Sequence, residues 1–260
     1  MTNKGVQQGE VWQLGDHILG CGSSLEKDFI DKVIGKEKIR CIMTDPPYGV
    51  AYIEGKRGLI NQRKDIQTIS VIKSDEIQTE EKYIAFTAEW LNAIKDHLDH
   101  YNACYIFNSD TLYPALRAGM KQAGFYYSQM IVWVKNTVVL GRKDYLTMHE
   151  LIAYGWFGRH KMDRSKAKSV IFHPKPTSSK IHPTMKPVGL LRKLIPNSAK
   201  VKEWVYDPFG GSGSTLIASE HLGRRTIIIE IDPTYCERII ARWEKLTGKE
   251  AEKVINSSKD

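Results

Sequence analysis

The chain has 260 residues and a hydrophobic fraction of 42%, enough to bury the core of one large domain. No apolar run approaches the roughly 18 residues of a membrane-spanning helix. The polar start MTNKGVQQGE also lacks a hydrophobic signal region, so we expect a cytosolic protein. The net charge of +8 favours a polyanionic partner.

Apolar runs rich in Ile, Val and Tyr alternate with amphipathic stretches along the chain. This alternation is typical of an α/β fold in which helices flank a mainly parallel central sheet. In chain order, the expected strands are 38–45, 102–109, 125–135, 149–157, 203–209 and 224–232. The expected helices are 80–97, 111–124, the segment after Pro187, 213–223 and 233–248, several of which end at glycine.

The cysteines are few and widely separated. None of them shows the CxxC or mixed Cys/His spacing of metal ligands, and the four are Cys21, Cys41, Cys104 and Cys236. We expect reduced thiols in the core, with no metal site and no disulfide framework.

Positive charge is concentrated between residues 159 and 180. This segment contains seven Lys or Arg residues and Asp163 as its only acid, so it carries +6 of the net +8. Such a run is either a solvated loop or a surface that contacts phosphates, and composition alone favours neither.

The stretch YDPFGGSGST, residues 206–215, runs from a predicted strand into a predicted helix. Glycines permit a tight turn, and a helix N-terminus offers free amides, so the stretch resembles a nucleotide-binding turn. The third glycine of the dinucleotide fingerprint is absent, because its position holds Leu216. The next predicted strand ends near Glu230, close to the spacing at which a carboxylate receives ribose hydroxyls, although an ordinary strand-end acid would look the same.

The stretch TDPPYGV, residues 44–50, places an acid, two prolines and an aromatic ring after another predicted strand. By itself, Asp45 could simply cap a turn. Together with the glycine turn and the strand-end acid, however, the stretch resembles the DNA amino-methyltransferases, which use S-adenosylmethionine to modify adenine N6 or cytosine N4. Further stretches similar to motifs of this family are WQLGDHILGCGSS, YIFNSD, IVWVKN, GRKDYLTMHELIAYGW, HPTMKP and IEIDPTYCERIIARW.

The order of these motifs resembles the β class of the family, in which the catalytic motif precedes the glycine turn in a circularly permuted arrangement. The resemblance implies a Rossmann-like class I methyltransferase fold in a single domain, 1–260. Within it we expect a catalytic half at 39–157, a short basic target-recognition segment at 158–181 and a cofactor-binding half at 182–248.

The resemblance also implies catalytic roles. The Asp45 carboxylate and the Pro46 carbonyl would accept hydrogen bonds from the target amino group. Pro46 and Pro47 would make this turn rigid, and Tyr48 would stack on a base flipped out of the duplex. Residues 108–110 and 135–136 lie at predicted strand ends, where they either line the same pocket or are structural.

S-adenosylmethionine is the implied cofactor. The glycine turn would surround its methionine part, Glu230 would hold the ribose, and the segment before Pro187, itself a candidate helix start, would close the opposite side. WQLGDHILGCGSS would hold the adenine, with Ser23 where the family often has aspartate. The expected cofactor-binding residues are Asp207, Phe209, Gly211, Gly213, Ser214, Thr215, Glu230, Lys186 and Pro187.

DNA is the implied partner, and basic side chains would bind its phosphates. The expected DNA-binding residues are Lys56, Arg57, Arg159, Lys161, Arg164, Lys166 and Lys168. We expect a homodimer or the 51–74 stretch to complete the grip on DNA. The resemblance favours a prokaryotic or phage setting and leaves a restriction-enzyme partner open.

Four alternatives differ in their chemistry. A cytosine C5 mechanism is disfavoured, because that family presents its nucleophilic thiol after proline and this chain has no Pro-Cys pair. DPPY favours adenine N6 within the resembled family, with cytosine N4 open. RNA and protein amino-methyltransferases carry related turns but usually place the glycine motif first. The last alternative is a methylase fold that binds DNA without catalysis.

Overall fold

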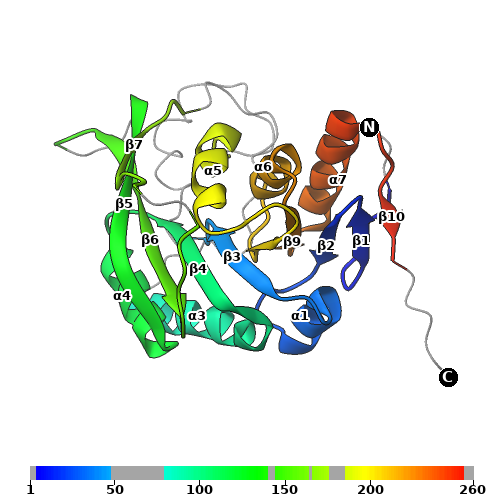
Figure 1. The fold of residues 1–260 in the computed structure, drawn as a ribbon, viewed down its shortest axis with the longest axis horizontal. Helices are drawn as coiled ribbons and strands as arrows, with labels where there is room; N and C mark the ends of the chain where they lie inside the picture. Colours follow the sequence, from blue (N-terminus) through cyan, green and yellow to red (C-terminus); the bar gives the residue numbers. More distant parts are fainter. Residues whose placement is uncertain (1–3, 48–78, 140–143, 164–165, 176–184, 255–260) are drawn as a thin grey trace, which may run out of the picture.

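The structure is a computed structural model that describes residues 4–47, 79–139, 144–163, 166–175 and 185–254. In these ranges the chain forms one mixed sheet flanked by helices (Figure 1). The strands are β1 (Val11–Leu14), β2 (His17–Cys21), β3 (Ile39–Thr44), β4 (Leu98–Asn108), β5 (Phe125–Val139), β6 (Thr147–Phe157), β7 (Val170–Phe172), β8 (Trp204–Asp207), β9 (Arg225–Glu230) and β10 (Glu252–Lys253).

The sheet has the order β10-β1-β2-β9-β8-β3-β4-β6-β5-β7. Its centre, from β2 to β4, is parallel, whereas β6 pairs antiparallel with both β4 and β5. The carboxyl ends of the central strands therefore meet at one edge, where open α/β sheets bind their ligands. We call this the carboxyl edge.

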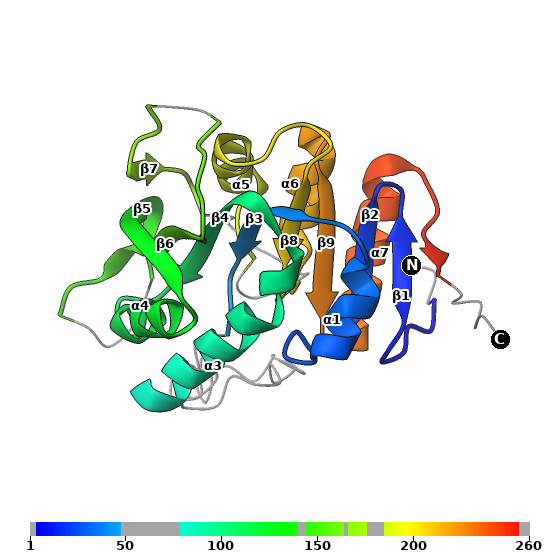
Figure 2. The same ribbon diagram turned by 60° about the horizontal axis from the view of Figure 1, so that its bottom comes forward.

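Helices cover both faces of the sheet (Figure 2). One face packs against α1 (Lys27–Ile34), α3 (Glu80–Ala93) and α4 (Tyr113–Gln122). The other packs against α5 (Val188–Leu194), α6 (Ser214–Leu222) and α7 (Pro233–Thr247). Two 3₁₀ turns follow helices, at Lys95–His97 and Ile195–Asn197.

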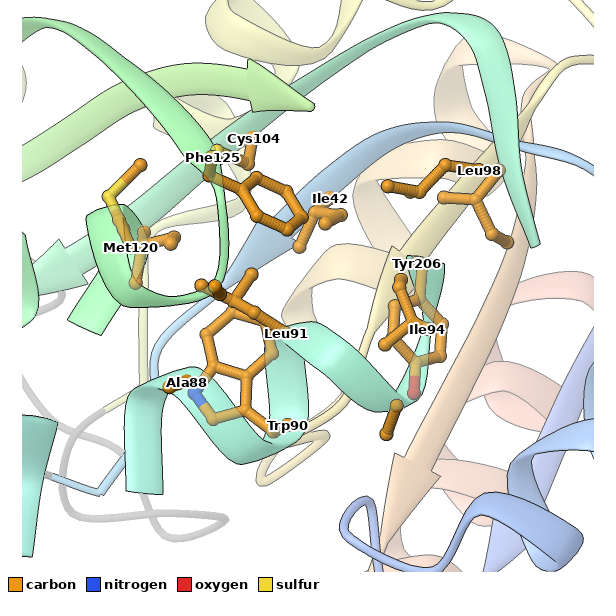
Figure 3. Close-up of a cluster of buried hydrophobic side chains, with 14 of the residues drawn as sticks. Ile42, Ala88, Trp90, Leu91, Ile94, Leu98, Cys104, Met120, Phe125 and Tyr206 are labelled. Atoms are coloured by element: carbon orange, nitrogen blue, oxygen red, sulfur yellow. The ribbon is translucent and has the colours of Figure 1, made fainter. Parts of the chain in front are cut away.

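Successive side chains of the central strands enter the hydrophobic cores on opposite faces of the sheet. On β3, Ile42 faces the α3 side while Cys41 and Met43 face the α5 side, as the two-residue period of a strand requires. Figure 3 shows the α3 side, where Trp90 and Leu91 pack near Ile42. All four cysteines are buried and free, as predicted.

Every predicted strand and helix is present, but five of the elements in the described ranges were missed. The strands β1, β2, β7 and β10 are short, so their apolar patterns are weak, and α1 has only eight residues. The predicted helix 80–97 is also interrupted, because its last turn is a separate 3₁₀ turn at Lys95–His97. The described ranges contain no helix long and apolar enough to span a bilayer, and no cluster of three potential metal ligands.

A buried histidine joins β2 to α6 and β9. The His17 Nε2 atom lies 2.9 Å from the Glu220 carboxylate, while the Thr226 N–H donates to Nδ1 at 3.0 Å. Burial is the largest influence on the pKa of His17 and lowers it below the ordinary 6.5, although Glu220 raises it. Neutral His17 is therefore the form that fits this position.

This arrangement predicts a pH-dependent stability. A group with a lowered pKa in the folded state binds protons more readily when unfolded, so the stability from neutral His17 should be complete above about pH 6.5 and decline as the pH falls below it. His17→Asn keeps an acceptor for Thr226 N–H without titrating, and it should flatten this decline. Urea unfolding from about pH 8 to about pH 5 measures it. An unchanged slope in the variant would contradict the assignment.

Candidate active site

The carboxyl edge carries Asp45 directly after β3. Every residue of β3 is buried, whereas the Asp45 side chain is 23% exposed. The buried Lys186 ammonium donates a hydrogen bond to Asp45 Oδ2 and also lies 3.2 Å from Glu150 Oε2. Burial alone would lower the pKa of Lys186, but the Asp45 and Glu150 carboxylates outweigh it and raise the pKa above its ordinary value. Lys186 is therefore a charged partner of Asp45.

The line of charges continues into the antiparallel flank. Lys135 on β5 lies 2.7 Å from Glu150 Oε1 on β6. Burial by itself would raise the pKa of Glu150, but Lys186 and Lys135 overcome this and lower it. The ammonium of Lys135 also lies 5.1 Å from the centre of the Trp133 ring. Lys135, Glu150, Lys186 and Asp45 therefore alternate in charge without interruption.

The remaining catalytic predictions fall partly outside the described residues. Pro46 is buried and Pro47 is half-buried, whereas Tyr48, Lys56, Arg57 and Arg164 lie outside the described ranges.

Asn108, predicted near the site, ends β4 at the carboxyl edge and is buried. Its side-chain amide donates to the Tyr83 hydroxyl at 2.8 Å, and its side-chain oxygen accepts from Ser109 N–H at 2.7 Å. These bonds give Asn108 a structural role.

Asp207 ends β8, the neighbour of β3. Its carboxylate accepts hydrogen bonds from Thr44 Oγ1 at 2.8 Å, Thr215 Oγ1 at 2.6 Å and Phe209 N–H at 3.2 Å. Burial raises the pKa of Asp207 to about 7, although these hydrogen bonds lower it. Asp207 thereby ties β3 to the start of α6.

Glu230 ends β9, and its side chain is hydrogen-bonded to the glycine turn. Its Oε2 accepts from Gly211 N–H at 2.7 Å, and its Oε1 accepts from Asp232 N–H at 2.9 Å. Burial raises the pKa of Glu230 above its ordinary value. The Glu230 carbonyl also accepts from Gly22 N–H at 2.9 Å, which brings the WQLGDHILGCGSS stretch beside it. The carboxylate and the two predicted cofactor segments therefore meet at one strand end.

The turn between β8 and α6 uses glycines in the left-handed region, with φ of 50° at Gly211 and 71° at Gly213. Residues other than glycine are strained in this region, because their Cβ atom crowds the backbone. A Cβ atom at Gly213 would also lie only 3.0 Å from Ile239 of α7. The sequence-based emphasis on these two glycines therefore has a clear steric basis.

Replacing Gly213 by alanine should reduce the free energy of unfolding more than the same replacement at Gly248. Gly248 after α7 has a similar φ of 72°, but a Cβ atom there would meet nothing within 4 Å. We expect Gly248→Ala to lower the free energy of unfolding by about 1–2 kcal/mol through backbone strain alone. Gly213→Ala should lower it by about 1 kcal/mol more, because of contact with Ile239. Equal losses in urea unfolding would show that this contact is absent.

Four other predicted cofactor residues have structural contacts. Thr215 binds Asp207, and Ser214 Oγ lies within 3.3 Å of the Arg242 guanidinium, which also donates to the Ser212 carbonyl at 2.7 Å. Phe209 packs against Phe86 and Trp90, with ring centres 5.7 Å apart in both cases. Pro187 is the N-cap of α5, as the helix-start alternative predicted.

The basic segment divides between the two ends of the sheet. The Arg159 carbonyl accepts from Asn102 N–H, and the Lys161 carbonyl accepts from the buried Arg40 near the start of β3. Because a strand rises about 3.3 Å per residue, Arg40 lies about 17 Å from Asp45. Arg159 and Lys161 are therefore at the end opposite the carboxyl edge.

The later part of the basic segment approaches the carboxyl edge. Lys166 and Lys168 are exposed, and the Ser169 carbonyl accepts from Val132 N–H at 2.7 Å. Val132 pairs with Leu151, which in turn pairs with Asn108 at the end of β4. Ser169 therefore lies near the carboxyl edge, and Lys168 is its neighbour in the chain.

Sequence analysis missed Glu150 and assigned Lys186 to the cofactor alone. Both residues are charged and lie among apolar neighbours, a pattern that signals paired burial. The partners could not be identified from the sequence, because Lys186 and Asp45 are 141 positions apart.

A family model described as DNA methylase matches residues 39–242. The chain is 26% identical over 232 residues to Type II methyltransferase M2.DpnII of Streptococcus pneumoniae, and the match covers 80% of this chain and 83% of that protein.

Two solved structures show a similar fold. TTHA0409 from Thermus thermophilus, complexed with S-adenosyl-L-methionine, has a TM-score of 0.65 at 18% identity, covering 94% of this chain and 100% of that chain. The PvuII DNA methyltransferase, which is cytosine-N4-specific, has a TM-score of 0.63 at 17% identity, covering 88% and 89%. With the family match over residues 39–242, the protein belongs to the N6/N4 DNA methylase family.

Proposed function

We propose that this DNA methyltransferase modifies adenine N6 on a base flipped out of the duplex. The observation that carries the proposal is the ion-paired Asp45 at the end of β3, which lies beside β8 with its terminal Asp207 and one strand farther from β9 with its terminal Glu230. This arrangement supports the proposal, because a carboxylate that could accept an amino group lies at the same edge as a glycine turn and a buried acid suited to a nucleoside. Amino-group methylation requires both a group that binds the target amine and groups that hold the methyl donor beside it.

S-adenosylmethionine is the cofactor, and it supplies a methyl group on a positively charged sulfur that leaves with the bonding electrons. Glu230 and the backbone around Gly211 and Gly213 would hold it. The fit rests on a nearly buried carboxylate at the carboxyl edge and on a turn whose glycines allow close backbone approach.

The chain's own residues orient the target. An exocyclic amine has two N–H donors and a lone pair delocalised into the ring, so it is a weak nucleophile. The Asp45 carboxylate and the Pro46 carbonyl accept one N–H each and direct the lone pair toward the methyl carbon for direct in-line displacement. Asp45 then accepts the proton that the methylated nitrogen releases. Tyr48, directly after the proline pair, stacks on the flipped base.

The DNA would approach the carboxyl edge. Lys168 and Lys175, whose backbone N–H donates to the Asn136 side chain at 3.0 Å, supply positive charge on this side. Lys56, Arg57, Arg164 and Lys166 belong to the same proposed phosphate-binding set, while Arg159 and Lys161 would reach only more distant phosphates. A homodimer would extend this basic surface.

Nucleoside analysis tests the choice of base. The protein is incubated with S-adenosylmethionine and unmethylated genomic DNA, which is then digested and examined by mass spectrometry. N6-methyladenine is the expected product, because Asp45 begins a DPPY rather than an SPPY turn. N4-methylcytosine as the main product would replace adenine by cytosine in the proposal while keeping the same site.

A further inference from the structure

The buried charges behind Asp45 extend farther than amino-group binding requires. Asp45 meets Lys186, Lys186 meets Glu150 at 3.2 Å, and Glu150 meets Lys135 at 2.7 Å. The side chains of Lys135 and Lys186 are only 3% and 9% exposed. Two cations and two anions therefore form one neutral line from β5 to the catalytic turn.

Such a line keeps a flexible side chain in one place. A buried ammonium must be paired, and removing one partner of a buried pair leaves the other charge uncompensated. Lys186 lies just outside α5 in the segment before Pro187, so its backbone does not belong to the sheet. Glu150, by contrast, is part of β6, which is hydrogen-bonded on both sides. The strand residue can therefore determine where the Lys186 ammonium lies.

We propose that Glu150 is a positioning residue for methyl transfer, which holds the Lys186 ammonium against Asp45 and is itself held by Lys135. The proposal rests on the function proposed above, because it concerns the carboxylate that accepts the target amine. The ammonium donates to Asp45 Oδ2 and thereby restricts the rotamer of Asp45, so that the carboxylate faces the target nitrogen. Glu150 does not touch the substrate and acts only through Lys186.

A double-mutant cycle tests this dependence. Single-turnover methyl transfer is measured for the wild type, Glu150→Gln, Lys186→Met and the double variant, along with dissociation constants for S-adenosylmethionine and DNA. Each single variant should slow transfer by roughly tenfold or more. Glu150→Gln should leave both dissociation constants within about threefold of wild type, and the double variant should be no slower than Lys186→Met.

Glu220→Gln is the matched control. Glu220 is another partly buried carboxylate, with 29% side-chain exposure against 22% for Glu150, but it bonds His17 and Trp243 away from Asp45. It should lower stability without changing the transfer rate. If Glu150→Gln does not fold, the variant Lys135→Met/Glu150→Gln removes both members of that ion pair. Its transfer rate is then compared with that of the triple variant, which adds Lys186→Met.

Two results would overturn the role of Glu150. One is a Glu150→Gln rate equal to wild type, and the other is a double variant whose loss is the product of the single losses. A wild-type protein that methylates no DNA would instead overturn the proposed function, and this is seen before any variant is compared.

Discussion

Asp45→Asn should slow methyl transfer by roughly a thousandfold or more, while the affinity for S-adenosylmethionine stays about the same. An amide replaces a charged acceptor by a neutral group that is half donor, so it accepts the N–H groups of the target base only weakly. The Lys186 ammonium also loses its bond to Asp45 but keeps Glu150. The fold should therefore survive, and the loss should appear in the chemical step.

Single-turnover kinetics and equilibrium cofactor binding measure the two parts of this expectation. Asp28→Asn, an exposed acid in the first turn of α1, is the control and should behave as wild type. Transfer by Asp45→Asn at a rate close to that of the control would remove Asp45 from the reaction.

Glu230→Ala should weaken S-adenosylmethionine binding by about 10- to 100-fold, because hydrogen bonds to a charged group contribute about 1.5–3 kcal/mol. The variant loses the acceptor for the proposed ribose hydroxyls. It also leaves the N–H groups of Gly211 and Asp232 without their carboxylate partner, which loosens the glycine turn. The affinity for S-adenosylmethionine should thus fall together with the order of the glycine turn.

Calorimetric titration with the cofactor measures this loss. Glu252→Gln on the exposed outermost strand β10, three strands from β9, removes the same charge and should bind the cofactor as wild type does. A dissociation constant for Glu230→Ala equal to that of Glu252→Gln would exclude Glu230 from the cofactor site.

Sequence pattern predicted the parallel centre of the fold well, because buried strands are continuous apolar runs between helices. The strands that end in Asp207 and Glu230 were predicted, and both residues lie at the carboxyl edge, Asp207 on the strand beside β3 and Glu230 on the next strand. The antiparallel flank could not be predicted in the same way. Strand direction in β6 depends on long-range pairing with β4, which leaves no local pattern.

The site was predicted less completely than the fold. Local motifs pointed to Asp45, Gly213 and Glu230 as candidates, since turn chemistry and strand ends are short-range features. Glu150 was missed because its role depends on two lysines from other segments. Arg159 and Lys161 were grouped with Lys168 by composition, yet their contacts lie at the end of the sheet opposite the carboxyl edge, whereas Ser169 beside Lys168 bonds Val132 near that edge.

The most direct test is transfer of labelled methyl groups from S-adenosylmethionine to DNA, RNA and protein offered in parallel, with wild type and Asp45→Asn compared. Label should enter DNA with the wild type and should be nearly absent with the variant. Label in RNA or protein, or no label in any substrate despite cofactor binding, would contradict the account of this site as a DNA amino-methyltransferase centre.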